Sequence, residues 1–136
     1  MDRRNFIRTA TAASAAGILA PSTVLASSNN NMAGGLYLTK EQPGRWDKKV
    51  GGHLPAVEVA GKKVKVTTAH SMTDYNHYIV KHQILDKDFN FLAENMFDPK
   101  KDKAPVSEFD LGNYSGKVYV LSVCNKHDTW MNAASV

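Results

Sequence analysis

The sequence predicts an all-β domain folded as an antiparallel β-sandwich. Short runs with a period of two alternate with clusters of turn-forming residues, and no convincing amphipathic helix or internal repeat occurs after residue 35. A chain of 136 residues is the length of one domain. The part that follows the N-terminal segment described below is long enough for one sandwich of this kind.

Turn signals divide this region into strands. Gln42-Pro43-Gly44 opens a turn-rich stretch in which Trp46 is the large aromatic residue. Two valine runs flank Ala60-Gly61-Lys62, which predicts a short hairpin. In a strand at 78–85, alternation places Tyr78, Val80, His82 and Ile84 on one face and His77, Ile79, Lys81 and Gln83 on the other. Further strands are expected at 89–92, 106–111 and 117–123, with a polar loop at 98–105.

The N-terminus has the pattern of an export signal. Arg3 and Arg4 precede an alanine-rich apolar stretch, and Val24-Leu25-Ala26 offers small residues for cleavage. Paired arginines indicate the twin-arginine route, and no later stretch is apolar and long enough to span a membrane. We therefore expect a protein of the periplasm with a twin-arginine signal peptide at 1–26, a disordered spacer at 27–35 and one domain at 36–136.

The charge of the chain excludes one class of partner. The formal net charge is +4, and about half of it belongs to the expected signal peptide. The lysines of the remainder form no block, so no nucleic-acid partner is expected. A mild positive field can still attract a small anion.

The residues that carry chemistry are the single cysteine and four of the five histidines. Cys124 has no second cysteine for a disulfide within the chain, and His127 follows it in a Cys-x-x-His run that a tight turn can bring to one metal ion. The other histidines expected to share this ion lie at strand ends or in loops, and they are His53, His70 and His77. His82 lies within a strand and is expected to be a surface or hydrogen-bonded residue.

Four imidazoles and one thiolate favour a redox metal over structural zinc, which prefers four ligands. On iron, five protein ligands leave one coordination position open for a small molecule. Copper is the alternative, because Cys124, His127 and Met131 with one upstream histidine match a blue-copper arrangement on a β-sandwich. Since that arrangement leaves two of the upstream histidines without a role, iron is favoured.

These residues resemble the superoxide reductase family, which comprises the neelaredoxins and the iron domain of the desulfoferrodoxins. The resemblance covers roughly 46–130 and is carried by His53-Leu54-Pro55, His70 with His77-Tyr78-Ile79, Ala104-Pro105, and Cys124-Asn125-Lys126-His127 with Trp130. It implies an immunoglobulin-like β-sandwich with a mononuclear iron site. The implied equatorial ligands are His53, His70, His77 and His127, and the implied axial ligand is Cys124.

The resemblance also implies an activity, the one-electron reduction of superoxide to hydrogen peroxide. The expected partners are superoxide, an electron-donor protein that the sequence does not identify and, as one option, further copies of the chain in a homo-oligomer. A blue-copper-like electron-transfer protein and a non-catalytic iron-binding or redox-sensing module are the alternative functions.

The chain departs from the family pattern beside the expected ligands. Gly51-Gly52 stand where family members usually carry Glu-Lys, of which the glutamate can bind oxidised iron and the lysine attracts superoxide and helps to supply protons. Lys48 and Lys49 are expected to provide the positive charge instead. Asp128 replaces the usual glycine after His127.

Overall fold

The computed structural model describes residues 32–136. The signal peptide expected at 1–26 and the first part of the spacer expected at 27–35 lie outside these residues. The end of that spacer, Met32–Gly35, forms a turn in which the backbone N–H groups of Gly35 and Leu36 donate to the Met32 carbonyl at 3.1 and 2.8 Å. Within residues 32–136, no helix has the length and apolarity needed to cross a bilayer.

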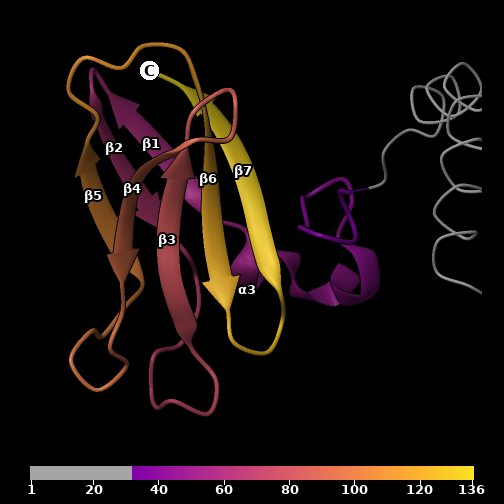
Figure 1. Ribbon diagram of the computed structural model, residues 1–136. Coiled ribbons are helices and arrows are strands. Elements are labelled where there is room, and N and C mark those ends of the chain that lie inside the picture. The colour runs from indigo at the N-terminus through magenta and orange to yellow at the C-terminus, as the bar shows by residue number, and fades with distance from the viewer. Residues whose placement is uncertain (1–31) are drawn as a thin grey trace, which may run out of the picture. The chain divides into compact units, whose positions relative to one another are not determined.

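Two antiparallel sheets make up the domain (Figure 1). The three-stranded sheet has the order β1-β2-β5 and consists of β1 (Ala56–Ala60), β2 (Lys63–Thr67) and β5 (Val106–Asp110). The four-stranded sheet has the order β4-β3-β6-β7 and consists of β4 (Phe91–Met96), β3 (Ile79–Leu85), β6 (Lys117–Cys124) and β7 (Thr129–Ser135). The predicted all-β, immunoglobulin-like antiparallel β-sandwich is confirmed.

The apolar core follows from the period-two pattern of the strands. Alternate residues of β2 and β6 point inward, and with one residue of β3 they form a buried cluster of Val64, Val66, Ile84, Val118 and Val120. A second buried cluster contains Met72, Ile79, Phe97 and Cys124. Cys124 therefore lies at the inner face of β6, next to apolar side chains.

A polar cluster is also buried in the sandwich. His82 on β3 is 0% exposed, and its ring nitrogens lie 2.8 Å from Thr68 Oγ1 and 2.8 Å from Ser107 Oγ. Thr68 Oγ1 also lies 2.8 Å from Ser122 Oγ on β6. Because these hydroxyls can each donate or accept, both ring nitrogens of a neutral imidazole are satisfied. His82 is thus a hydrogen-bonded residue, one of the two roles expected for it.

Two features of the strands differ from the prediction. The register of β3 on β6 shifts between Ile79 and Lys81, so Ile79 faces the core together with His82 instead of lying on the opposite face. The strand expected at 89–92 begins later, because Phe89 has a φ of 67° and belongs to the turn before β4. The last strand, β7, was not predicted, since its sequence lacks an apolar alternation.

A short helical segment precedes the first strand. The 3₁₀ helix η1 (Gly44–Lys49) leads into the single helical turn α3 (Val50–His53), and Trp46 has non-helical backbone angles inside η1. His53 thus ends a helical turn, whereas its place in the sequence predicted a strand end or a loop. Gly51 and Gly52 give the turn little intrinsic helix propensity, and contacts made by η1 with the β6–β7 turn, described below, fix the segment instead.

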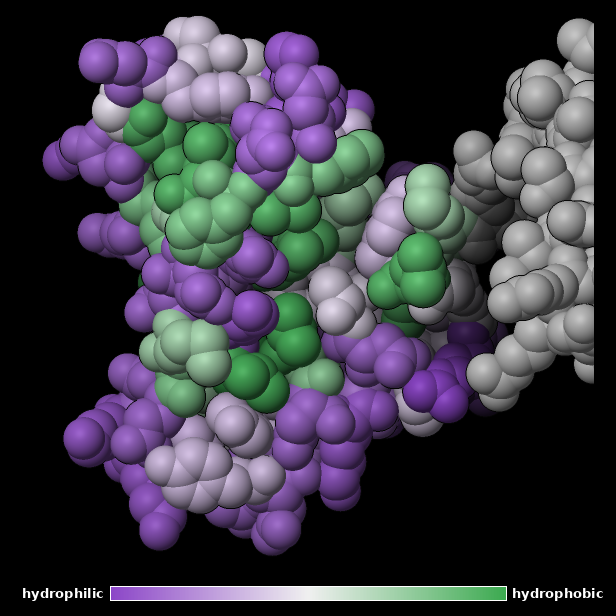
Figure 2. Space-filling model, in the orientation of Figure 1, coloured by the Kyte–Doolittle hydropathy of each residue, from purple (hydrophilic) through white to green (hydrophobic). Residues whose placement is uncertain are grey.

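The surface offers no continuous apolar area on the face seen in Figure 2, where apolar side chains form separate groups divided by hydrophilic ones. Phe91 and Met96 on β4 are exposed to 58% and 60%. The ion pair between Lys81 and Glu94, at 2.8 Å, lies between β3 and β4 and contributes to the hydrophilic part of this sheet.

Candidate metal centre

Separate segments deliver the candidate ligands. His53 ends α3, His70 lies three residues after β2, and His77 lies two residues before β3. Cys124 ends β6, and His127 lies in the turn to β7. The β2–β3 loop and the β6–β7 turn lie at the same end of the sandwich, at the bottom of Figure 1. The fold thus gathers residues from distant parts of the sequence at one place.

The ligand atoms of four of these residues converge. One donor atom from each of His53, His77, Cys124 and His127 lies within 4.8 Å of the others. His70 adjoins this group, with its Nε2 3.0 Å from His77 Nε2, and His77 Nε2 lies 2.9 Å from His127 Nδ1. Nitrogens bound at right angles to one ion at about 2.1 Å are separated by about 3 Å. The spacing of these nitrogens therefore suits a shared transition-metal ion.

Outer hydrogen bonds orient two of the imidazoles. His53 Nδ1 lies 2.9 Å from the Lys49 carbonyl oxygen, and His70 Nδ1 lies 2.6 Å from the Ser71 carbonyl oxygen. Since a carbonyl oxygen only accepts, each Nδ1 carries the proton and each Nε2 presents a lone pair. His53 Nε2 is buried, and no residue in 32–136 makes a hydrogen bond to it. A buried nitrogen without a hydrogen-bond partner, on a histidine grouped with His77, Cys124 and His127, is what a metal ligand requires.

The surroundings of His53, His77 and His127 favour the neutral form of these three imidazoles. Burial and, to a smaller extent, the neighbouring histidines lower the pKa of His53 to about 4, although the hydrogen bond to the Lys49 carbonyl acts in the opposite direction. The pKa values of His77 and His127 are also lowered, first by burial and then by nearby positive groups that include Lys49 and Lys126. A neutral imidazole keeps the lone pair that binds a metal, so the site is ready for an ion at neutral pH.

Cys124 completes the donor set with sulfur. Its side chain is buried, and Sγ lies 3.6 Å from His127 Nδ1. The backbone N–H of Lys126 donates to the same sulfur at 3.4 Å. A mixed set of imidazole nitrogens and one thiolate is typical of redox-active iron or copper sites. The residues present thus fit a single transition-metal ion.

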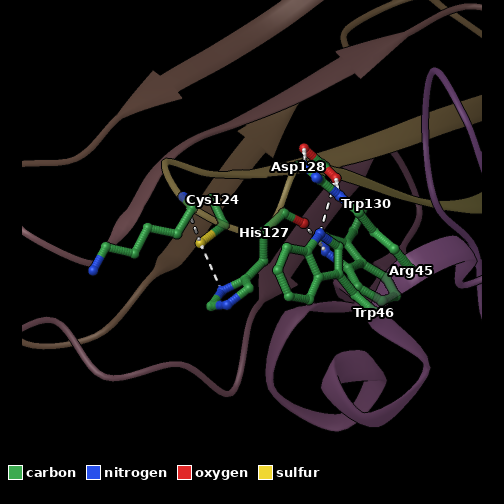
Figure 3. A network of polar contacts seen from close by, with 7 residues as sticks. Arg45, Trp46, Cys124, His127, Asp128 and Trp130 are labelled. Carbon is green, nitrogen blue, oxygen red and sulfur yellow. Dashed lines mark hydrogen bonds and ion pairs between the residues drawn. The ribbon is translucent and has the colours of Figure 1, made fainter.

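Two tryptophans pack around the site. Trp46 lies at right angles to the His127 ring with 4.6 Å between ring centroids, and Trp130 lies 5.8 Å from the His53 ring. Trp130 Nε1 donates to the His127 carbonyl at 2.8 Å. Figure 3 shows both indoles beside His127, with Asp128 and Arg45 on their far side. Aromatic packing therefore limits the positions open to the ligand-bearing turn.

Comparison with known proteins agrees with this geometry. The family model described as Desulfoferrodoxin matches residues 45–133. This chain belongs to the desulfoferrodoxin family. A search of curated proteins finds no match.

Solved structures of superoxide reductases share the fold of this desulfoferrodoxin-family chain. The neelaredoxin from Ignicoccus hospitalis is 24% identical with a TM-score of 0.62, and the match covers 76% of this chain and 95% of that one. The superoxide reductase from Giardia intestinalis is 21% identical with a TM-score of 0.55, over 62% and 98% of the two chains. The enzyme from Treponema pallidum is 30% identical with a TM-score of 0.51, over 63% and 69%.

The lysines expected to assist this site are not equivalent. Lys48 and Lys49 are both exposed at the end of η1. Lys49 contributes to the lowered pKa values of His77 and His127, and its carbonyl orients His53. Lys48 makes no such contribution among the shifts of the described residues. The structure therefore associates Lys49 with the site more closely than Lys48.

Met131 does not lie where the blue-copper alternative needs it. It pairs with Leu121 across β6 and β7, whereas the buried Trp130 pairs with Ser122. Ser122 and Cys124 share the inner face of β6, so Met131 is on the opposite face from the thiol. This placement removes the expected axial ligand of a blue-copper site.

Some residues around the site were missed from the sequence. Lys126 lies inside the Cys-x-x-His run and acts on the histidine pKa values, but a lysine at the middle of a motif gives no separate signal. Arg45 contacts Asp128 across 83 positions of the sequence. The departure from glycine at Asp128 was the one available indication of this contact.

Proposed function

We propose that this protein is a superoxide reductase with a mononuclear iron centre held by His53, His70, His77, His127 and Cys124. The observation that carries the proposal is the buried, unpartnered Nε2 of His53, a residue whose donor atom lies within 4.8 Å of those of His77, Cys124 and His127, with His70 adjoining at His77. Membership of the desulfoferrodoxin family and the shared fold with superoxide reductases support it.

The reaction is the addition of one electron and two protons to superoxide, which yields hydrogen peroxide. Ferrous iron held by the four histidines and Cys124 would supply the electron, and an external donor protein would return it. The chain contributes fixed imidazoles, because the carbonyls of Lys49 and Ser71 hold His53 and His70 with their Nε2 lone pairs facing the site. Lys49 and Lys126 contribute the positive potential that attracts an anionic substrate.

Gly51, two residues before His53, borders open space. A Cβ built at Gly51 meets no atom within 4 Å, and one at Gly52 lies 3.4 Å from the Ala69 carbonyl oxygen. No carboxylate is available at either position to act as a further ligand. We therefore propose that substrate reaches the centre without displacing a protein side chain there.

Metal analysis and rapid mixing test this function. The purified protein should contain about one iron per chain, and mixing its reduced form with superoxide should yield one peroxide per oxidised centre. Cys124→Ser is the matched control, since it keeps the histidines and removes the sulfur donor. Stoichiometric copper would contradict the iron centre, and bound iron without peroxide formation would identify a non-catalytic iron-binding or sensing module.

We also propose export by the twin-arginine route to the periplasm, on the basis of Arg3 and Arg4. Replacing both arginines by lysine should leave the protein in the cytoplasmic fraction of the native host. Equal export of the variant would contradict this route.

A further inference from the structure

Two of the four candidate imidazoles, those of His77 and His127, lack the carbonyl hydrogen bond that orients His53 and His70. His53 and His70 each point Nδ1 at a carbonyl oxygen, at 2.9 and 2.6 Å. His127 faces the site with Nδ1, and its Nε2 makes no hydrogen bond to any residue in 32–136. The ring of His127 is free to rotate about its side-chain bonds unless packing prevents it. The rings of His53 and His77 pack on it from within the group of candidate ligands, and Trp46, at right angles to it and 4.6 Å away, packs on it from outside that group.

Trp46 is itself held by a charged group. Its Nε1 donates to Asp128 Oδ2 at 2.9 Å. The same carboxylate accepts from Arg45 Nε and Arg45 Nη2, each at 3.1 Å, which is the two-pronged geometry of a strong arginine–carboxylate pair. The Arg45 guanidinium also lies 4.9 Å from the centre of the Trp46 ring. These contacts join η1 to the β6–β7 turn, as Figure 3 shows.

The backbone at Asp128 points to a role for its side chain. Asp128 has a φ of 67°, in the left-handed region that glycine adopts freely and that aspartate tolerates at a small steric cost. Glycine at this place would make the turn without that cost, but it would leave Arg45 and Trp46 without their shared acceptor. Strain that persists at a ligand-bearing turn is a reason to look for a function there.

We propose that Arg45, Trp46 and Asp128 form a clamp that positions His127 at the metal centre, with Asp128 as its anchor. These are positioning residues, since they act through His127 and the Trp46 ring. The proposal rests on the metal-binding role of His127 proposed above. Without the clamp, the His127 ring samples orientations in which Nδ1 faces away from the other donors.

Three variants and a control test the clamp. Asp128→Gly removes the carboxylate while suiting the left-handed backbone, so the turn itself is not strained. Asp128→Asn keeps an oxygen acceptor for the indole but loses the charge. Arg45→Gln changes a side chain that is 69% exposed, so the core stays intact. Lys87→Gln is the control, since it removes an exposed ion pair with Asp88 in the β3–β4 turn, away from the ligands.

Two measurements separate this proposal from the proposed function. In metal-free protein, NMR of the Trp46 indole N–H and the His127 ring should show shifted and broadened signals in Asp128→Gly and smaller changes in the other two variants. Ferrous ion affinity should fall roughly tenfold to 100-fold in Asp128→Gly, with partial recovery in Asp128→Asn. Unchanged His127 signals and affinity in Asp128→Gly, or an equal loss in Lys87→Gln, would overturn the clamp. If the unaltered protein bound no metal, the function would fail, while the ring signals would still decide the clamp.

Discussion

His53 and His82 have the same chemistry and nearly the same burial, but different surroundings. They are 4% and 0% exposed, and burial lowers the pKa of each to about 4. His82 has a hydroxyl 2.8 Å from each ring nitrogen, whereas His53 has a carbonyl at Nδ1 and no partner at Nε2. Neither burial nor a lowered pKa distinguishes the two residues.

The unpaired nitrogen does distinguish them. A buried polar atom without a hydrogen bond costs about 1–3 kcal/mol of stability, so His53 destabilises the metal-free fold where His82 stabilises it. A metal ion bound at Nε2 offsets that cost. We infer that His82 serves the fold and His53 serves the site, and the two residues can be exchanged for phenylalanine as a matched pair.

The largest expected effect is on metal binding by His53→Phe. Phenylalanine keeps an aromatic ring of similar size and removes the donor nitrogen, so ferrous ion affinity should fall by at least roughly 100-fold. Isothermal titration calorimetry of the metal-free variants with ferrous ion measures this affinity. His82→Phe should bind the ion within about threefold of the unaltered protein, because it contacts none of the candidate ligands. Equal losses in the two variants would break the distinction.

The next largest effect is on stability, and here His82→Phe is expected to be the more damaging of the two variants. His82→Phe removes hydrogen bonds to Thr68 and Ser107 and leaves buried hydroxyls with fewer partners, which should cost roughly 2–4 kcal/mol in the free energy of unfolding. His53→Phe should leave the stability of the metal-free protein unchanged or higher. Denaturant unfolding at neutral pH tests both. If His53→Phe lost as much free energy of unfolding as His82→Phe, His53 would be a structural residue.

The pH dependence sharpens the role of His82. Its pKa is about 4 in the folded protein and about 6.5 when unfolded, so between these values the unfolded chain binds a proton that the folded chain does not. The contribution of neutral His82 is complete above pH 6.5 and is lost as the pH falls toward 4, by roughly 3 kcal/mol. The stability gap between the unaltered protein and His82→Phe should therefore narrow between pH 7 and 4.5 in metal-free samples. A gap that stays constant would contradict the assignment.

The sequence predicts the sandwich better than it predicts the centre. Period-two valines and turn residues are local signals, and they are enough for the strands around Ala60-Gly61-Lys62. The turn that carries His53 is different, because two glycines give it no helical signal and its place depends on the pairing of Arg45 with Asp128, 83 positions away. Likewise the bulge at Ile79 arises from pairing with β6, which alternation along one strand does not reveal.

The candidate ligands were found because their side-chain chemistry is rare in the chain. A single cysteine and five histidines form a short list, and position at strand ends selected four of the histidines. That His82 is hydrogen-bonded was one of two expectations, and only its contacts with Thr68 and Ser107 decide between them. Which nitrogen of each histidine faces the ion depends on carbonyls of the folded backbone and has no sequence signal.

The smallest expected effect concerns nearby positive charge, in which the surroundings of His82 and of the candidate metal ligands also differ. Burial alone lowers the pKa of His82, whereas Lys49 contributes to the lowered pKa values of His77 and His127. Lys49→Gln removes this charge but keeps the backbone carbonyl that orients His53, so metal affinity should hold while the pKa values of His77 and His127 rise in the metal-free protein. The rate with superoxide should fall about twofold to fivefold at low salt, and the difference should fade at high ionic strength, where screening shortens the reach of the field.

Lys48→Gln is the matched control and should change the rate by less than about 1.5-fold. Equal rates for the two variants at low salt would show that neither lysine guides the anion, and the positive potential would then have to come from Lys126.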